Sequence, residues 1–182
     1  QDNGTLKKIN YIRNSVKILV DAYDGTMKFY ITDRTDPIVM AYWNMYPKLF
    51  EDLDSQIPED ISKHFVYPEY LYNIQAEILK QYHKIQPEVL YRSDDVWDTA
   101  KENTSKVTTL VGTDIEPCYT AVKTVDNEKT VLGLVLPYTI NEKQNINAYL
   151  VGSYNEKGDK KLTLYKFNKD EAILGTLQLD TL

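Results

Sequence analysis

The sequence predicts an α+β fold with an N-terminal β-hairpin, central helices and C-terminal, mainly antiparallel strands forming one sheet. Three observations support this. Two alternating runs surround an Asp-Gly pair within residues 16–33, helix-start signals gather in residues 36–98, and short strand-like segments fill residues 119–179. Because strands and helices are segregated along the chain instead of alternating, an α+β fold is favoured over an α/β fold.

The hairpin is predicted from the runs VKILVDAY and TMKFYITD, which flank Asp24-Gly25. Both central residues of a type I′ turn need a positive φ, and Asp-Gly between alternating runs is a strong signal for this turn. A two-residue loop would pair Val20 with Phe29. One face of the hairpin would then be apolar, formed by Val16, Ile18, Val20, Ala22, Met27, Phe29 and Ile31.

Helix starts are marked by proline beside an acidic residue. Asp36 can cap a helix that has Pro37 at its first position and that ends or kinks at Pro47. The predicted apolar stripe of this helix consists of Ile38, Val39, Tyr42, Met45 and Tyr46. Three further starts are predicted at Pro58-Glu59, Pro68-Glu69 and Pro87-Glu88, and the middle one opens the best-patterned helix, residues 68–84.

The second half of the chain reads as strands. These are predicted at residues 119–125, 130–137, 148–154, 161–167 and 176–179. The run VLGLVLP is almost entirely apolar, so its strand is expected to be central and buried on both faces. Residues 1–9 are expected to be disordered and residues 99–113 to form a loop. We expect residues 1–182 to be a single soluble domain, or a fragment of a larger region.

Bulk composition limits the function classes. A net charge of −6, from 21 basic and 27 acidic residues, argues against a nucleic-acid partner. Cys118 is the single cysteine, so an internal disulfide and a cysteine-based metal site are both excluded. No apolar run is long enough to span a bilayer, and the chain begins at Gln1 instead of Met, which indicates a processed or cut piece.

Metal and cofactor sites are not predicted. The histidines, His64 and His83, lie nineteen residues apart without a His-Glu-x-x-His pattern. Clustered carboxylates around the hairpin could bind Ca²⁺, but turn, cap and ion-pair roles account for them; they are Asp21, Asp24, Asp33 and Asp36. No cofactor is expected, because glycine-rich phosphate loops are also absent from the sequence.

One acidic cluster leaves two interpretations open. Asp94, Asp95 and Asp98 surround Trp97, and paired carboxylates beside an aromatic ring are used by glycosidases. A hydrolase could use these acids together with His83. The alternative interpretation is a capped turn with a buried Trp97 anchor. No Gly-x-Ser-x-Gly nucleophile motif occurs.

An ordered series of segments resembles a known family. The segments are DAYDGT, DPI, YPE with a later YH, DVWD, EPCYTAV, VLPYT, LYKF and GTLQL. In this order they resemble uncharacterised protein family 0182 of the UPF series, bacterial integral membrane proteins. The resemblance runs from about Asn10 to Leu179 and is weakest in residues 99–113.

The resemblance implies a location and a partner but no chemistry. In that family several transmembrane helices precede a large soluble part expected on the extracytoplasmic side of the cell membrane, and this chain would be a fragment of it. Its partner would be the remainder of its own membrane-embedded chain. The family implies no activity, so no catalytic residue is assigned. Candidate ligand-binding residues are Gln75, His83, Asp94 and Trp97.

Three functions therefore stand as hypotheses. The first is a non-enzymatic extracytoplasmic domain that packs on the rest of its chain or binds a partner. The second is a glycan- or peptide-binding domain, suggested by the many tyrosines together with Trp43 and Trp97. The third is the hydrolase that would use His83 with the acids around Trp97.

Overall fold

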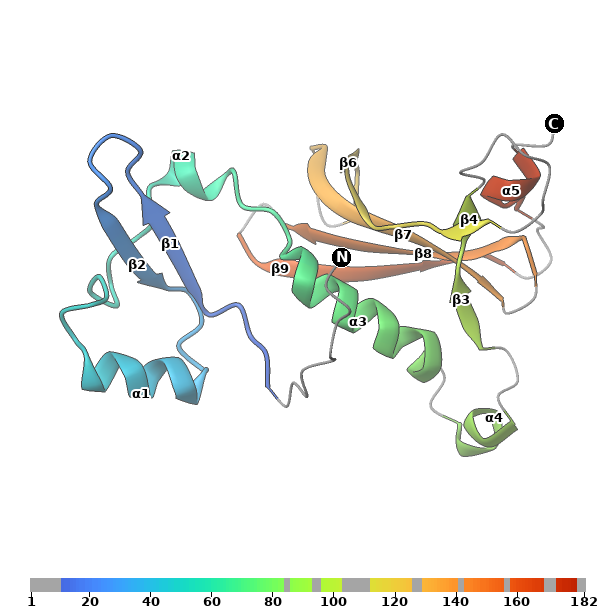
Figure 1. Cartoon of the computed structure of the whole chain (residues 1–182), viewed down its shortest axis with the longest axis horizontal. Helices are drawn as coiled ribbons and strands as arrows, with labels where there is room; N and C mark the ends of the chain where they lie inside the picture. The colour runs from blue at the N-terminus through green and yellow to red at the C-terminus, as the bar shows by residue number, and fades with distance from the viewer. Residues whose placement is uncertain are drawn as a thin grey trace. The chain divides into compact units, whose positions relative to one another are not determined.

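The structure is a computed structural model. It describes residues 11–83, 86–92, 96–102, 112–125, 129–140, 143–155, 158–168 and 173–179. Contacts divide the chain into two compact units, Gln1–His64 and Phe65–Leu182. The predicted α+β class is confirmed, since an N-terminal antiparallel hairpin and several helices precede a C-terminal antiparallel sheet (Figure 1).

Unit 1 begins with the predicted hairpin, formed by β1 (Val16–Val20) and β2 (Met27–Ile31). The predicted register is wrong, because Val20 pairs with Met27 and not with Phe29. The strands are joined by a wider loop over residues 22–25, and the Asp21 amide donates to the Thr26 carbonyl at 2.9 Å.

Side-chain capping explains the wider loop. The Asp24 carboxylate accepts the Thr26 amide and the Asp21 carboxylate accepts the Tyr23 amide, both at 2.8 Å. These side-chain bonds satisfy backbone amides of the wider loop. The same amides would be arranged differently in a two-residue turn. Gly25 has a φ of +74°, so the left-handed conformation expected of this glycine is present. The register shift is two residues, so every side chain keeps its predicted face.

The apolar face of this hairpin is covered unevenly. The Phe50 ring packs edge-on against Phe29, with ring centroids 6.3 Å apart. Ile18, which pairs with Phe29, and Val20 and Met27, which lie nearer the turn, are each more than half exposed. This end of the hairpin therefore presents apolar side chains outward.

Helix α1 (Pro37–Met45) starts at the predicted cap, where the Asp36 carboxylate accepts the amides of Ile38 and Val39. The predicted stripe does not form a buried face, because Val39 alone among its members is buried. The others are exposed: Ile38, Tyr42, Met45 and Tyr46. Unit 1 closes with the short helix α2 (Glu59–Ser62), which begins at the predicted Pro-Glu signal.

Unit 2 is built on an antiparallel sheet with the order β3-β7-β8-β9, and β6 also pairs with β7. The strands are β3 (Trp97–Thr99), β6 (Cys118–Val122), β7 (Val131–Ile140), β8 (Ile146–Tyr154) and β9 (Lys160–Lys166). The VLGLVLP segment lies in β7, which has partners along both sides, so its predicted central position is confirmed.

Helix α3 (Glu69–Tyr82) runs across this sheet, in the position predicted for the best-patterned helix (Figure 1). The core between them consists of Tyr67, Tyr72, Ala76, Trp97, Leu134, Leu136, Tyr138, Ala148 and Leu150. Buried tyrosine hydroxyls find backbone partners here. Tyr72 donates to the Leu150 carbonyl and Tyr138 donates to the Ala76 carbonyl, each at 2.9 Å. Burial raises the pKa of both phenols, which therefore remain neutral donors.

Shorter elements complete unit 2. Helix α4 (Pro87–Arg92) begins at the third Pro-Glu signal, and β4 (Lys101–Glu102) pairs with β5 (Thr113–Asp114) at the two ends of the predicted loop. The strand predicted at residues 176–179 is wrong, since α5 (Thr176–Leu179) is helical. The Gln178 side chain accepts the Gly175 amide at 2.9 Å, which is the reach-back bond of a helix capping box.

Candidate functional site

A groove of about 380 Å³ lies within unit 1, between the segment before β1 and the start of α1. Its lining residues are Arg13, Asn14, Ser15, Val16, Asp36, Ile38, Val39, Tyr42 and Phe50. Polar groups come mainly from residues 13–15 and Asp36, and apolar groups come from β1, α1 and Phe50. The groove can therefore receive an apolar group beside a charged wall.

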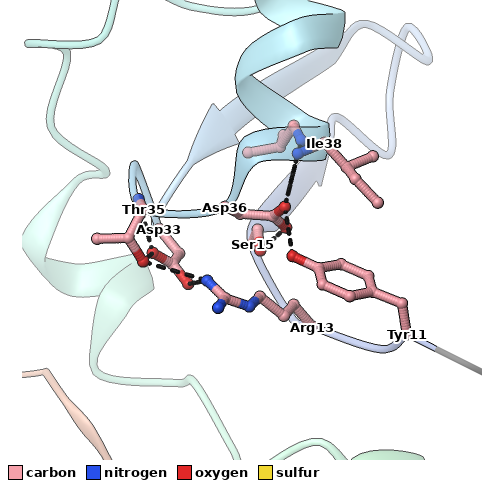
Figure 2. Close-up of polar contacts among 8 residues, drawn as sticks. Tyr11, Arg13, Ser15, Asp33, Thr35, Asp36 and Ile38 are labelled. Atoms are coloured by element: carbon pink, nitrogen blue, oxygen red, sulfur yellow. Dashed lines mark hydrogen bonds and ion pairs between the residues drawn. The ribbon is translucent and has the colours of Figure 1, made fainter.

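Asp36 organises the polar wall, as Figure 2 shows. Its Oδ2 accepts a 2.5 Å bond from the Ser15 hydroxyl, and its Oδ1 accepts the Tyr11 hydroxyl at 2.8 Å and the Ile38 amide at 3.0 Å. The residue is only 4% exposed. The bond from Ser15 lowers the pKa of Asp36 to about 2 despite the opposing effect of burial, and the Tyr11 and amide bonds add to the decrease.

These bonds make Asp36 a structural carboxylate. It holds residues 11–15 against the start of α1 while it caps the helix. The Ser15 hydroxyl points to a carboxylate already bonded to three other groups, so this pair is not arranged as a nucleophile with its general base.

Arg13 forms a second polar contact between the same segments (Figure 2). Its Nη1 lies 3.3 Å from Asp33 Oδ2 and donates to Thr35 Oγ1 at 3.1 Å. Asp33 in turn accepts the amide and the hydroxyl of Thr35, at 2.9 and 2.6 Å. The guanidinium carbon also lies 5.7 Å from the Tyr11 ring centroid. Together these contacts fix the side of the groove that carries charge.

The acidic cluster around the hairpin is divided by the fold. Asp21 and Asp24 cap the β1–β2 loop, whereas Asp33 and Asp36 bind Arg13, Ser15 and Tyr11. Within the described ranges, no group of three or more histidine, cysteine, aspartate or glutamate side chains is arranged to hold a metal ion.

Two of the predicted ligand-contacting residues meet in unit 2. The His83 and Trp97 rings stack with their centroids 3.9 Å apart and an interplanar angle of 13°. Lys166 Nζ lies 5.5 Å from the Trp97 ring centroid. Because Trp97 is 4% exposed, its ring packs inside the unit and is not a stacking platform for a glycan.

The other candidates lie elsewhere. Gln75 accepts the Tyr67 hydroxyl at 2.7 Å, and it precedes His83 on α3 by about 12 Å along the helix axis. Asp94 and Asp95 lie outside the described residues. Asp98 accepts the Thr99 amide at 2.9 Å and lies 3.9 Å from Lys80 Nζ.

Sequence reasoning missed the polar residues that shape the groove, namely Tyr11, Ser15 and Thr35. Tyr11 and Ser15 bond to Asp36, which lies more than twenty residues further along the chain. No short-range spacing in the sequence therefore predicts these contacts. Asp36 was predicted as a helix cap and as one member of the acidic cluster around the hairpin, but not as the residue that organises a groove.

Comparison with known proteins finds a family match over the whole chain. The model of the Uncharacterised protein family (UPF0182) matches residues 1–182. A UPF0182 protein of Caldicellulosiruptor saccharolyticus is 42% identical over 178 residues, covering 98% of this chain and 19% of its own length. One from Microcystis aeruginosa is 38% identical, covering 96% of this chain and 18% of its own length.

The chain thus spans less than a fifth of the length of these relatives. No solved structure matches it. None of the helices in the described part of the chain combines the length and the apolar character needed to cross a bilayer. On the match over its full length, the chain belongs to the uncharacterised protein family UPF0182.

Proposed function

We propose that this chain is a non-enzymatic domain of a longer bacterial membrane protein, held on the extracytoplasmic side of the membrane. Its role is to pack against the remainder of its own chain or to bind a protein partner. The length of the relatives supports a larger assembly, since the chain accounts for only 18–19% of them.

One observation carries this proposal: unit 1 exposes much of its apolar surface. Ten of the twenty exposed large apolar side chains in the described part of the protein lie within residues 11–49. Ile18, Val20 and Met27 share one face of the hairpin. Contiguous apolar surface on a folded protein marks an interaction site or an aggregation liability, so we assign this face to a partner.

Location is tested with Cys118, which is exposed. Intact cells that express the full-length protein are treated with a membrane-impermeant maleimide, and the Cys118→Ala variant gives the background. We expect Cys118 to be labelled without permeabilisation. Labelling only after permeabilisation would contradict the extracytoplasmic location.

Packing is tested by placing a charge on the hairpin of the full-length protein. Val20→Asp should increase the rate of proteolysis, because a carboxylate would be buried in the proposed contact. Val125→Asp is the matched control, since Val125 lies in unit 2 and is 87% exposed. Equal proteolysis of the two variants would show that the hairpin face is not covered.

A further inference from the structure

Helix α1 carries an exposed apolar stripe, defined here as Ile38, Tyr42, Met45 and the C-cap residue Tyr46. These side chains are 49% to 64% exposed. Their spacing of four, three and one residues places them on one side of the helix, within an arc of about 100°. No residue from Pro37 to Pro47 is charged, so the stripe has no charged border along the helix.

The α1 stripe is not the surface that holds α1 in unit 1. Val39 is buried, and Met40 and Trp43 are half-buried, on the adjoining side of the helix. Helix α1 is therefore apolar on the side that packs in unit 1 and also on the side that faces outward. A helix that is apolar around most of its circumference is typical of one that is covered on more than one side.

The groove described above continues the α1 stripe. Ile38 and Tyr42 belong to both, and Val16 and Phe50 are further apolar residues that line the groove. Its polar wall is held in place by the bonds of Asp36 to Ser15 and Tyr11. A partner lying along the stripe thus finds a recess of about 380 Å³ that can accept one or two apolar side chains.

We propose that the α1 stripe and this groove bind an apolar α-helix from the same polypeptide, outside these 182 residues. The inference rests on the proposed packing function and specifies the surface that makes the packing contact. The stripe is about 12 Å long, which is two helical turns, and rows of side chains at this spacing pack against those of a second helix.

The length of the relatives favours a segment of the same chain over a separate partner. More than four-fifths of each relative lies outside the matched region, and a tethered segment binds at a high effective concentration. An anionic lipid surface is disfavoured because acids outnumber bases in the sequence that flanks α1. The acids are Asp33, Asp36, Glu51, Asp52 and Asp54, and the bases are Arg34 and Lys48.

Photo-crosslinking in the full-length protein tests the inference. The photoreactive residue p-benzoylphenylalanine replaces Tyr42 in native membranes, and it replaces Tyr91, which is 92% exposed in unit 2, as the matched control. Two copies of the protein that carry different affinity tags are expressed in the same cells, and the native membranes are irradiated. We expect Tyr42 to crosslink several-fold more than Tyr91, within single polypeptides, to an apolar segment outside residues 1–182.

Other products would overturn the inference. Crosslinks between the two differently tagged copies would assign the stripe to a second copy, and adducts with lipid would assign it to the membrane surface. A yield equal to that at Tyr91 would show an uncovered stripe. Met45→Lys should abolish the Tyr42 crosslink, because it places a charge in the contact, whereas Met45→Leu should retain it.

The two proposals can fail separately. If Val20→Asp disturbs packing but Tyr42 crosslinks to another molecule, the assignment of the α1 stripe is wrong and the packing function stands. If Cys118 is labelled only in permeabilised cells, the proposed location is wrong whatever Tyr42 contacts.

Discussion

The Ser15 hydroxyl donates a 2.5 Å hydrogen bond to the Asp36 carboxylate across 21 residues of sequence, and both side chains are buried. The bond joins the segment that enters β1 to the cap of α1. Asp36 thereby stabilises local structure, by capping the helix, and tertiary structure, by fixing the groove.

Removing the Ser15 hydroxyl should destabilise unit 1. Ser15→Ala leaves one buried carboxylate oxygen without its donor, and the expected loss is about 1–3 kcal/mol in the free energy of unfolding. Urea denaturation followed by circular dichroism measures it. Ser62→Ala is the control, since the Ser62 hydroxyl donates to a backbone carbonyl at an exposed position. A loss no greater than that of Ser62→Ala would contradict the structural role of this bond.

The same carboxylate predicts an acid dependence. Hydrogen bonds lower the pKa of Asp36 from 3.8 to about 2. Because the folded pKa is below the unfolded value, the stabilisation is fully present above about pH 4 and is lost as the pH falls towards 2. The urea midpoint of unit 1 should fall over this interval in the native chain and fall less in Asp36→Asn. Identical pH profiles for the two proteins would refute the assignment.

Glycine is required at position 25 by the backbone conformation, and not by a lack of space for a side chain. Its φ is +74°, and a Cβ added there would meet no atom within 4 Å. Gly25→Asn should therefore be nearly neutral, Gly25→Ala should cost about 1 kcal/mol, and Gly25→Val should cost more. Thermal unfolding of the three variants checks the order. Equal stability of Gly25→Val and the parent chain would exclude a left-handed residue in the turn.

Gly152 is required by close packing. A Cβ at this position would lie 2.7 Å from Tyr72 Cδ2 and 3.0 Å from Tyr67 Cγ. Tyr72 cannot move away easily, because its hydroxyl is bonded to the Leu150 carbonyl. Gly152→Ala should destabilise unit 2 by about 1–3 kcal/mol.

A double-mutant cycle gives the control for Gly152. Tyr72→Leu removes the opposing ring, so Gly152→Ala should cost less in that background than in the parent chain. Purely additive effects would show that the clash with Tyr72 is not the cause of the loss.

Patterns in the sequence predicted the elements better than their partners. The hairpin, the α1 cap and the central strand β7 follow from turn chemistry, capping and apolar runs, all of which are local. The register failed because Asp21 and Asp24 bind backbone amides of the loop, which strand alternation does not report. The predicted faces of the hairpin are nevertheless correct, because a register error of an even number of residues leaves each side chain on the same face.

Burial was the harder inference. Periodicity marks a side of a helix as apolar but does not say what covers it. Of the five residues of the apolar stripe predicted from the sequence, only Val39 is buried. Residues 176–179 alternate like a strand, yet a reach-back bond from Gln178 to Gly175 starts a helix. The groove was invisible because Ser15 and Tyr11 meet Asp36 only in three dimensions.

The stacked pair His83–Trp97 distinguishes a structural site from a catalytic one. The rings lie 3.9 Å apart, and Trp97 also packs on Tyr138 with centroids 5.5 Å apart. His83→Ala should therefore lower stability by about 0.5–1.5 kcal/mol and shift Trp97 fluorescence to longer wavelength, because one face of the indole loses its cover. The measurement uses a Trp43→Phe background, so that Trp97 is the remaining tryptophan. His83→Phe should restore most of both properties, since an aromatic ring can replace the stack. Loss of a hydrolytic activity in His83→Phe, with stability and fluorescence restored, would instead favour a catalytic histidine.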